Sequence, residues 1–298
     1  MLAEDLNAWT RLRETLQDMA RTTRGTLKYV PNQGNAGDAL ISAGTWQFFD
    51  DCGIAPEYTS TRAIAAGDSL IYAGGGNLVP EYDNCQKFLE GCLAVNVARA
   101  LVLPHTIRGH EALLARLDKR FTLVCRDEAS LQRVRATGTG AEVIYAPDMA
   151  LYINVARLYE RCKGYGGWGL WSKFLRRGKL WQYLRWTRAL DRLPVPQSGG
   201  IDVIRVDAEA TTRGDPRWDV SNFYGSMYHF REETDLVGRD LLSLFKRIKR
   251  VRTNRLHVGV AGALMNCEVT YLDNSYGKIR AVYDASMRHL PSVRFEAS

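Results

Sequence analysis

Short apolar segments alternate with helix-like segments between Gly25 and Leu151, and this alternation constrains the fold more than any other feature of the sequence. Strands are expected at Leu27–Val30, Glu57–Thr59, Ser69–Ala73, Ala100–Leu103, Phe121–Cys125 and Glu142–Ala146. Helices are expected at Asp38–Asp51, Asn84–Arg99, His110–Leu117 and Asp127–Thr137. Such alternation predicts an α/β protein with a parallel, doubly wound sheet.

A second, smaller α/β pattern follows residue 200. The expected elements there are a strand at Ile201–Val206, helices at Glu232–Arg250 and Val258–Met265, and a strand at Cys267–Leu272. Residues 4–21 carry apolar side chains at helical spacing and predict an N-terminal helix packed on the body. We therefore predict an N-terminal Rossmann-like domain (1–157), a basic aromatic insertion and linker (158–200) and a compact C-terminal Rossmann-like domain (201–298).

Glycine and polar residues follow five of the six expected strands of the first region, namely the first and the third to sixth. They are Asn35-Ala36-Gly37-Asp38, Gly74-Gly75-Gly76-Asn77, Pro104-His105-Thr106, Arg126-Asp127 and Pro147-Asp148. Ligands of open α/β sheets bind beyond the carboxyl ends of the strands, so these loops predict one crevice. The structural alternatives are a buried core histidine for His105 and an ion pair with Asp127 or Asp148 for Arg126.

The second unit carries two candidate anion sites at predicted helix starts. In Thr253-Asn254-Arg255-Leu256-His257, free backbone N–H groups and the positive end of the helix dipole favour an anion. Arg255 adds a bidentate donor, and His257 adds a group that exchanges a proton near neutral pH. Ser275-Tyr276-Gly277-Lys278 repeats this arrangement with Lys278 as the cation. The alternative is that both are ordinary solvated helix starts.

Composition narrows the possible functions. The net charge of +7 suits a polyanionic substrate, nucleic acid or an anionic membrane. No segment approaches the ~18 to 20 apolar residues of a membrane span, and residues 1–5 do not resemble a secretion signal. The six scattered cysteines include no Cys-x-x-Cys pair and predict reduced thiols of a cytoplasmic protein, without a metal site. Neither a Gly-x-Gly-x-x-Gly motif nor a Gly-Lys-Ser/Thr phosphate loop supports a nucleotide cofactor.

The ordered set of motifs resembles the polysaccharide pyruvyl transferase family. The matching segments are Asn35–Ile41, Gly74–Asn77, Leu103–Thr106, Arg126–Ser130, Pro147–Asp148, Arg255–His257 and Asp273–Lys278. The resemblance implies two domains similar to those of the GT-B glycosyltransferases. It also implies phosphoenolpyruvate as the donor substrate, no further cofactor, and a sugar diol as the acceptor, joined as a cyclic pyruvate ketal.

The resemblance also implies roles for particular residues. Arg126, Arg255, His257 and Lys278 would serve the donor, and we expect the three cations to meet at one anion site in the interdomain cleft. We infer that the acceptor lies near the Asn-x-Gly-Asp and Gly-Gly-Gly loops, because we expect them in the other domain. The proton transfers of the reaction make His257 the candidate acid and Asp38 the candidate base. The further predicted substrate-binding residues are Asn35, Gly37, Gly75, Gly76, Asn77, His105, Asn254, Leu256 and Ser275.

Two competing functions follow from the same features. A nucleotide-sugar glycosyltransferase of GT-B architecture would share the fold and would bind a nucleotide diphosphate. A non-enzymatic anion-binding or nucleic-acid-binding module would explain the positive charge and the aromatic residues interleaved with cations, although no nucleic-acid-binding motif is present.

Residues 164–188 contain four of the seven tryptophans, interleaved with lysine and arginine. Their order can place Leu170, Trp171, Phe174, Leu175, Leu180, Trp181 and Leu184 on one helical face. This is typical of a helix that lies at a membrane interface, and it predicts contact with the inner face of the cytoplasmic membrane beside a lipid-linked acceptor. The alternative is that these aromatic side chains pack between domains or subunits.

Overall fold

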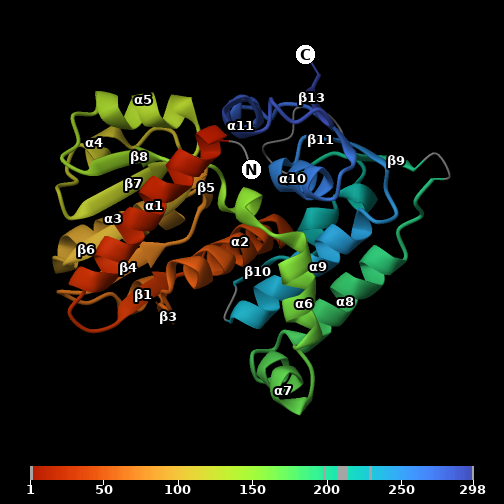
Figure 1. The fold of residues 1–298 in the computed structure, drawn as a ribbon, viewed down its shortest axis with the longest axis horizontal. Helices are drawn as coiled ribbons and strands as arrows, with labels where there is room; N and C mark the ends of the chain where they lie inside the picture. Colours follow the sequence, from red (N-terminus) through yellow and green to blue (C-terminus); the bar gives the residue numbers. More distant parts are fainter. Residues whose placement is uncertain (1–2, 197–198, 207–213, 228–229, 297–298) are drawn as a thin grey trace. The chain divides into compact units, whose positions relative to one another are not determined.

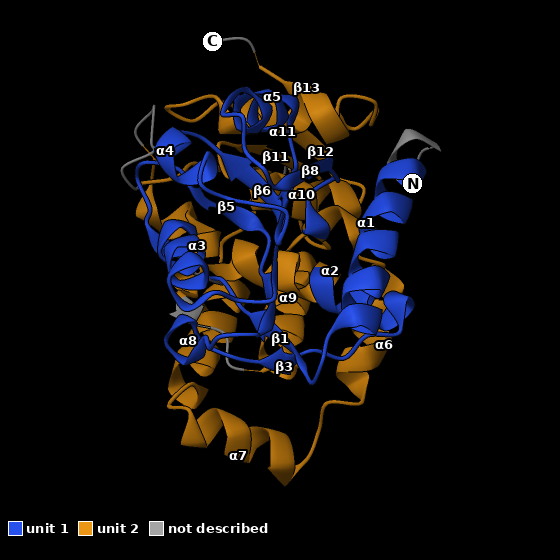
Figure 2. Cartoon of the chain, turned by 90° about the vertical axis from the view of Figure 1, so that its left-hand side faces the viewer, with its two compact units in different colours: residues 1–32, 45–149 blue, residues 33–44, 150–298 orange. Residues whose placement is uncertain are grey.

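A computed structural model of the chain describes residues 3–196, 199–206, 214–227 and 230–296, which form an α/β protein with parallel sheets (Figure 1). The chain divides into two compact units, coloured separately in Figure 2. Unit 1 comprises residues 1–32 and 45–149, and unit 2 comprises residues 33–44 and 150–298. Residues 33–44, which we expected in the first domain, thus group with the second unit, as does the whole segment 158–200.

Unit 1 contains a parallel sheet of order β3-β1-β4-β6-β7-β8, with β5 added beside β6. Its strands are β1 (Leu27–Val30), β3 (Glu57–Tyr58), β4 (Ser69–Tyr72), β5 (Gly75–Leu78), β6 (Arg99–Ile107), β7 (Phe121–Cys125) and β8 (Glu142–Tyr145). Its helices are α1 (Ala3–Thr22), the end of α2 (Ala36–Cys52), η1 (Thr61–Ala63), α3 (Asn84–Val95), α4 (Glu111–Leu114) and α5 (Glu128–Ala136). The predicted strands of this region are therefore confirmed.

The core of unit 1 lies on both faces of its sheet, because successive side chains of each buried strand point to opposite faces. On one side, α1 buries Trp9, whose ring lies 5.6 Å from that of Phe48 on α2. On the other side, α3 buries Phe88 against Tyr72 of β4, with 4.7 Å between ring centroids. Both faces of the sheet are thus covered, as a parallel sheet requires.

Unit 2 contains a parallel sheet of order β13-β12-β11-β9 and a short antiparallel pair of β2 with β10. Its strands are β2 (Gln33–Gly34), β9 (Gly200–Val203), β10 (Ser226–Met227), β11 (Arg250–Thr253), β12 (Glu268–Tyr271) and β13 (Val293–Phe295). Its helices are the start of α2, α6 (Val155–Lys163), α7 (Trp168–Arg176), α8 (Leu180–Asp191), η3 (Pro216–Trp218), η4 (Val220–Phe223), α9 (Arg231–Leu244), α10 (Leu256–Leu264) and α11 (Lys278–Ser286); η2 (Met149–Tyr152) spans the unit boundary.

Several sequence expectations differ from the structure. Pro104-His105-Thr106, expected to follow a strand, lies within β6. The expected helix Asn84–Arg99 ends at Val95, because Asn96 adopts a left-handed conformation and Arg99 begins β6. The Gly74–Asn77 segment, expected to be a loop, forms most of β5 and pairs with the second half of β6. The expected helix Glu232–Arg250 ends at Leu244, because Arg250 begins β11. The single helical face expected over 170–188 is divided between α7 and α8, since Gly178 adopts a φ of 66° that ends the first helix.

Candidate active site

The carboxyl ends of β1 and β4 form a topological switch point in unit 1. The chain runs from β1 to β3 on one side of β1, and then crosses to β4 on the other side. Asn32 follows β1, and its Oδ1 accepts a 2.6 Å hydrogen bond from Asn77 Nδ2. Asn32 Nδ2 lies 3.4 Å from the carbonyl oxygen of Gly74, to which it donates. A Cβ at Gly75, whose φ is 153°, would lie 2.6 Å from Asn32 Nδ2. The glycine run therefore allows β5 to pass close to Asn32.

His105 lies fully buried beneath this network. Its Nε2 is 3.1 Å from the backbone nitrogen of Asn77 and 2.8 Å from Asn77 Oδ1. Burial, followed by the nearby positive charge of Arg126, lowers the pKa of His105 to about 3. His105 is consequently neutral at physiological pH and holds Asn77 in place, while its predicted contact with substrate stays a prediction.

Arg126 follows β7 and is also buried. Its Nη1 lies 2.5 Å from Asp148 Oδ2, and its Nε donates a 2.9 Å hydrogen bond to Thr106 Oγ1. The ion pair with Asp148 considered as a structural alternative is thus present. The role of Arg126 in donor binding stays a prediction.

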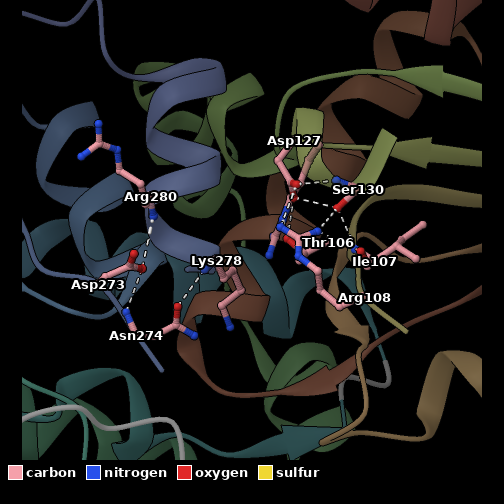
Figure 3. A network of polar contacts seen from close by, with 10 residues as sticks. Thr106, Ile107, Arg108, Asp127, Ser130, Asp273, Asn274, Lys278 and Arg280 are labelled. Atoms are coloured by element: carbon pink, nitrogen blue, oxygen red, sulfur yellow. Dashed lines mark hydrogen bonds and ion pairs between the residues drawn. The ribbon is translucent and has the colours of Figure 1, made fainter. Parts of the chain in front are cut away.

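A second arginine at the same edge was not predicted from the sequence. Arg108 follows β6, and its guanidinium lies 3.0 Å from Asp127 Oδ1 and 2.6 Å from Ser130 Oγ (Figure 3). Asp127 caps α5 by accepting a 2.8 Å hydrogen bond from Ser130 N, and it also accepts one from Thr106 Oγ1. The Arg-Asp-x-x-Ser motif therefore builds a polar network through Asp127 and Ser130 as well as through Arg126.

In unit 2, the chain leaves β9, β11 and β12 at one edge of the sheet. Asn254 is fully buried after β11, and its Oδ1 accepts a 2.7 Å hydrogen bond from the backbone nitrogen of Arg205. Asn254 Nδ2 has no hydrogen-bond partner within the described residues. A buried amide donor costs free energy unless another group accepts a hydrogen bond from it. The amide of Asn254 is therefore suited to donate to an oxygen atom of a ligand.

Arg255 forms a bidentate ion pair with Asp219. Arg255 Nε lies 2.8 Å from Asp219 Oδ1, and Arg255 Nη2 lies 2.5 Å from Asp219 Oδ2. Both side chains are buried, with exposed fractions of 6% and 1%. Asp219 was not identified from the sequence, because it precedes a short 3₁₀ helix in a region without periodicity. It fixes the orientation of the guanidinium and offsets its charge.

The start of α2 lies against His257, which is in the first turn of α10. A Cβ at Gly37 would lie 2.9 Å from His257 Cβ and 3.0 Å from His257 Nδ1. Asn35 Oδ1 accepts a hydrogen bond from Gly37 N, and Asp38 Oδ2 accepts one from Asn35 N, both at 2.8 Å. These reciprocal bonds form a capping box, so Asp38 stabilises the start of α2. The loops of the predicted acid and base thus lie side by side in one unit.

The last predicted motif begins α11. Lys278 N donates a 2.9 Å hydrogen bond to Asn274 Oδ1, and Gly277 precedes it with a φ of 74° (Figure 3). Lys278 Nζ lies 5.2 Å from the centroid of the Tyr276 ring. Asn274 is buried and accepts from the first N–H group of the helix, whereas Ser275 is exposed. The motif therefore positions Lys278 at a helix start, as the sequence predicts.

The structure assigns the predicted residues to both units. Unit 1 contains Gly75, Gly76, Asn77, His105 and Arg126, and unit 2 contains Asn35, Gly37, Asp38, Asn254, Arg255, Leu256, His257, Ser275 and Lys278. Leu256 is buried, and its carbonyl oxygen accepts a 2.8 Å hydrogen bond from Tyr271 Oη. The expected meeting of Arg126 with Arg255 and Lys278 stays a prediction.

The described residues offer little support for metal or thiol chemistry. They contain no group of three or more His, Cys, Asp or Glu side chains that could hold a metal ion. The six cysteines are buried and unbridged, and burial raises the pKa of Cys52 to about 11 and that of Cys125 to about 12. A thiolate nucleophile is therefore disfavoured at these positions. Within the described residues, no helix has the length and apolar character needed to cross a bilayer.

Comparison with known proteins extends these findings. The sequence model of the polysaccharide pyruvyl transferase family matches residues 35–276. A Bacillus subtilis (strain 168) protein named "Putative pyruvyl transferase EpsO" is 24% identical over 289 residues, which cover 89% of this chain and 85% of that protein. A crystal structure of a functionally uncharacterized protein from Klebsiella pneumoniae has a TM-score of 0.75 at 22% identity, covering 98% of this chain and 99% of that chain.

Proposed function

Because the chain belongs to the polysaccharide pyruvyl transferase family, we propose that it transfers the enolpyruvyl group of phosphoenolpyruvate to two hydroxyls of a sugar. The product is a cyclic pyruvate ketal, and inorganic phosphate is released. The acceptor is a lipid-linked precursor of an exopolysaccharide. A GT-B arrangement of two Rossmann-like domains is part of the same proposal.

The observation that carries the proposal is the contact between Gly37 and His257. It places a residue that can deliver a proton beside the loop that carries the Asp38 carboxylate, within one unit. The side chains of Asp38 and His257 are partly exposed, so a substrate can reach them.

The reaction balances with these two groups. His257 delivers a proton to the methylene carbon of phosphoenolpyruvate, which becomes a methyl group, and the adjacent carbon develops oxocarbenium character. Asp38 accepts the proton of the first sugar hydroxyl as its oxygen bonds to that carbon. The C–O bond to phosphate then breaks, the second hydroxyl adds, and its proton leaves with the phosphate or the solvent. Proton transfers of this kind typically contribute about 10²- to 10⁴-fold to the rate.

The donor carries a carboxylate and a phosphate, so it needs several cations and N–H donors. Arg255 contributes a guanidinium that Asp219 holds in place, and the adjacent, buried Asn254 amide offers an N–H donor. Lys278 adds a cation at the start of α11. We assign Arg126 to the donor as well, through the motif that it shares with the family.

Two assays test the proposal. The enzyme is incubated with phosphoenolpyruvate and a panel of synthetic and lipid-linked glycosides, and phosphate release is measured with and without each acceptor. A parallel panel of nucleotide-sugars replaces phosphoenolpyruvate. Acceptor-dependent phosphate release from phosphoenolpyruvate supports the proposal. Sugar transfer from a nucleotide-sugar, with no phosphate released from phosphoenolpyruvate, identifies a glycosyltransferase instead.

A further inference from the structure

Helices α7 and α8 (residues 168–191) form a hairpin at one extremity of unit 2. Both views show α7 beyond the ends of α6 and α8 (Figures 1 and 2). Its inner side is anchored by Phe174, whose ring lies 5.1 Å from that of Tyr183 and 5.0 Å, edge to face, from that of Phe230. Tyr183 Oη donates a 2.8 Å hydrogen bond to Asp240 on α9. The hairpin is thus an ordered part of the unit.

The outer side of the hairpin exposes large apolar side chains. Trp168, Trp171 and Leu175 share one face of α7 and are 81%, 37% and 56% exposed. Trp181 at the start of α8 is 69% exposed. Single exposed apolar side chains are common on proteins, whereas a group of them on one short element often marks a docking surface. Tryptophan in particular favours the headgroup zone of a bilayer.

Cations accompany these side chains on both helices. Arg176 and Arg177 end α7, while Arg185 and Arg188 share the exposed face of α8 with Trp181. No carboxylate of the described chain forms an ion pair with any of these four arginines. Their uncompensated charge makes the outer side of the hairpin complementary to a negative surface.

A pocket of about 540 Å³ opens beside the cations. Its lining within the described residues is Lys173, Arg176, Arg177 and Phe230. Lys173 Nζ lies 2.6 Å from Glu232 Oε1, so the carboxylate offsets one of the three charges and leaves two. The two guanidinium groups can bind a phosphate, and the ring of Phe230 can contact an organic group attached to it.

We propose that the α7–α8 hairpin docks on an anionic lipid bilayer. Trp168, Trp181 and Leu175 enter the headgroup zone, and Arg176 and Arg177 bind a lipid phosphate at the pocket. The pattern of exposed tryptophan with flanking arginine is that of an interfacial segment, which lies on the membrane without crossing it. The docking is independent of the reaction proposed above, since none of these residues belongs to the candidate active site.

Vesicle flotation of the full chain tests the charge component. Vesicles of phosphatidylcholine alone are compared with vesicles of phosphatidylcholine and phosphatidylglycerol in equal parts. We expect binding to the anionic vesicles and a loss of about 25-fold in the variant Arg176→Gln/Arg177→Gln, from about fivefold for each arginine. The matched control is Arg133→Gln/Arg135→Gln in the last turn of α5, which removes the same charge from another exposed helix end and leaves binding unchanged.

The apolar component is tested with two substitutions at the exposed tryptophans. Trp168→Ser/Trp181→Ser should release the protein from anionic vesicles, and Trp168→Phe/Trp181→Phe should retain most of the binding. Sedimentation of each variant checks for self-association. Equal, negligible flotation of the wild type on both kinds of vesicle overturns the proposal. So does a dimer that only the serine variant dissociates, or a salt-dependent oligonucleotide complex without vesicle binding.

Discussion

Gly37 and His257 lie so close together that a Cβ on residue 37 would be 2.9 Å from the Cβ of His257 and 3.0 Å from its Nδ1. The absence of a side chain at residue 37 therefore determines where the imidazole can sit. The relationship joins the first turn of α2 to the start of α10, more than half of the sequence away.

Replacing Gly37 by Ala should displace His257 and lower turnover. Overpacking of this kind also destabilises a protein by about 1–3 kcal/mol. The control is Gly91→Ala in α3, where an added Cβ meets nothing within 4 Å and where alanine should stabilise the helix by roughly 0.5–1 kcal/mol. Activity and denaturant unfolding are measured for both variants. Full activity in Gly37→Ala would contradict the assigned role of this contact.

His257→Gln should reduce the transfer rate by about 10²- to 10⁴-fold, because a glutamine amide cannot deliver a proton. The fold should be retained, since His257 is partly exposed at a helix start. Single-turnover kinetics at saturating phosphoenolpyruvate measure the step directly, and circular dichroism verifies the fold. A near-normal single-turnover rate removes His257 from the role of acid.

Two substitutions of Asp38 separate its capping role from its catalytic role. Asparagine can still accept the hydrogen bond from Asn35 N, so Asp38→Asn should melt close to the wild type and yet lose turnover. Asp38→Ala should lose turnover and also about 0.5–2 kcal/mol of stability. If Asp38→Asn keeps its turnover, the carboxylate serves only as a helix cap.

Replacing Asp219 by Asn should break its buried ion pair with Arg255. Breaking such a buried ion pair typically costs about 3–5 kcal/mol, so Asp219→Asn should unfold at clearly lower denaturant concentration. Glu296→Gln is the control, because it breaks another bidentate pair, with Arg252, that is largely exposed and contributes little. Arg255→Lys should fold and should raise the KM for phosphoenolpyruvate, since an ammonium group lacks the planar fork.

Much of the fold could be predicted from the sequence, because buried parallel strands are continuous apolar runs between polar loops. The strand β5 could not, since Gly75 and Gly76 carry no side chain that favours a strand and the pairing comes from the backbone of β6. The break between α7 and α8 depends on the conformation of Gly178. Its flanking residues continue the helical pattern, so periodicity alone does not reveal it.

The positions of Arg255, His257 and Lys278 at loops that precede helices were predictable, because these residues form short motifs. The supporting carboxylates of the candidate site were harder to identify. Asp219, which pairs with Arg255, lies in a region without regular periodicity. Arg108 contacts Asp127 because the two strands that they follow, β6 and β7, are neighbours in the sheet. Such partners are distant in sequence and depend on the tertiary fold. The ion pair of Arg126 with Asp148 was one of two that the sequence offered, the other being with Asp127; Asp148 follows a strand that lies beside that of Arg126.

The buried His105 should make stability depend on pH. Its pKa is about 3 in the folded protein, well below the ordinary value near 6.5, so the unfolded chain binds a proton that the folded chain excludes. Stability should therefore be intact above about pH 6.5 and should fall toward pH 3, by about 1.4 kcal/mol per pH unit from this group. His105→Gln should flatten that slope relative to His289→Gln, an exposed control. Parallel slopes in the two variants would contradict a neutral, buried His105.

The central claim is that the carbon skeleton of phosphoenolpyruvate is transferred after protonation of its methylene carbon. The most direct measurement is the reaction in D₂O with a sugar diol acceptor, followed by NMR of the methyl group in the product. We predict a sugar-linked pyruvate ketal whose methyl group carries a single deuterium, with inorganic phosphate released in equal amount. A phosphorylated sugar with pyruvate left in solution, or a ketal methyl without deuterium, would contradict the mechanism.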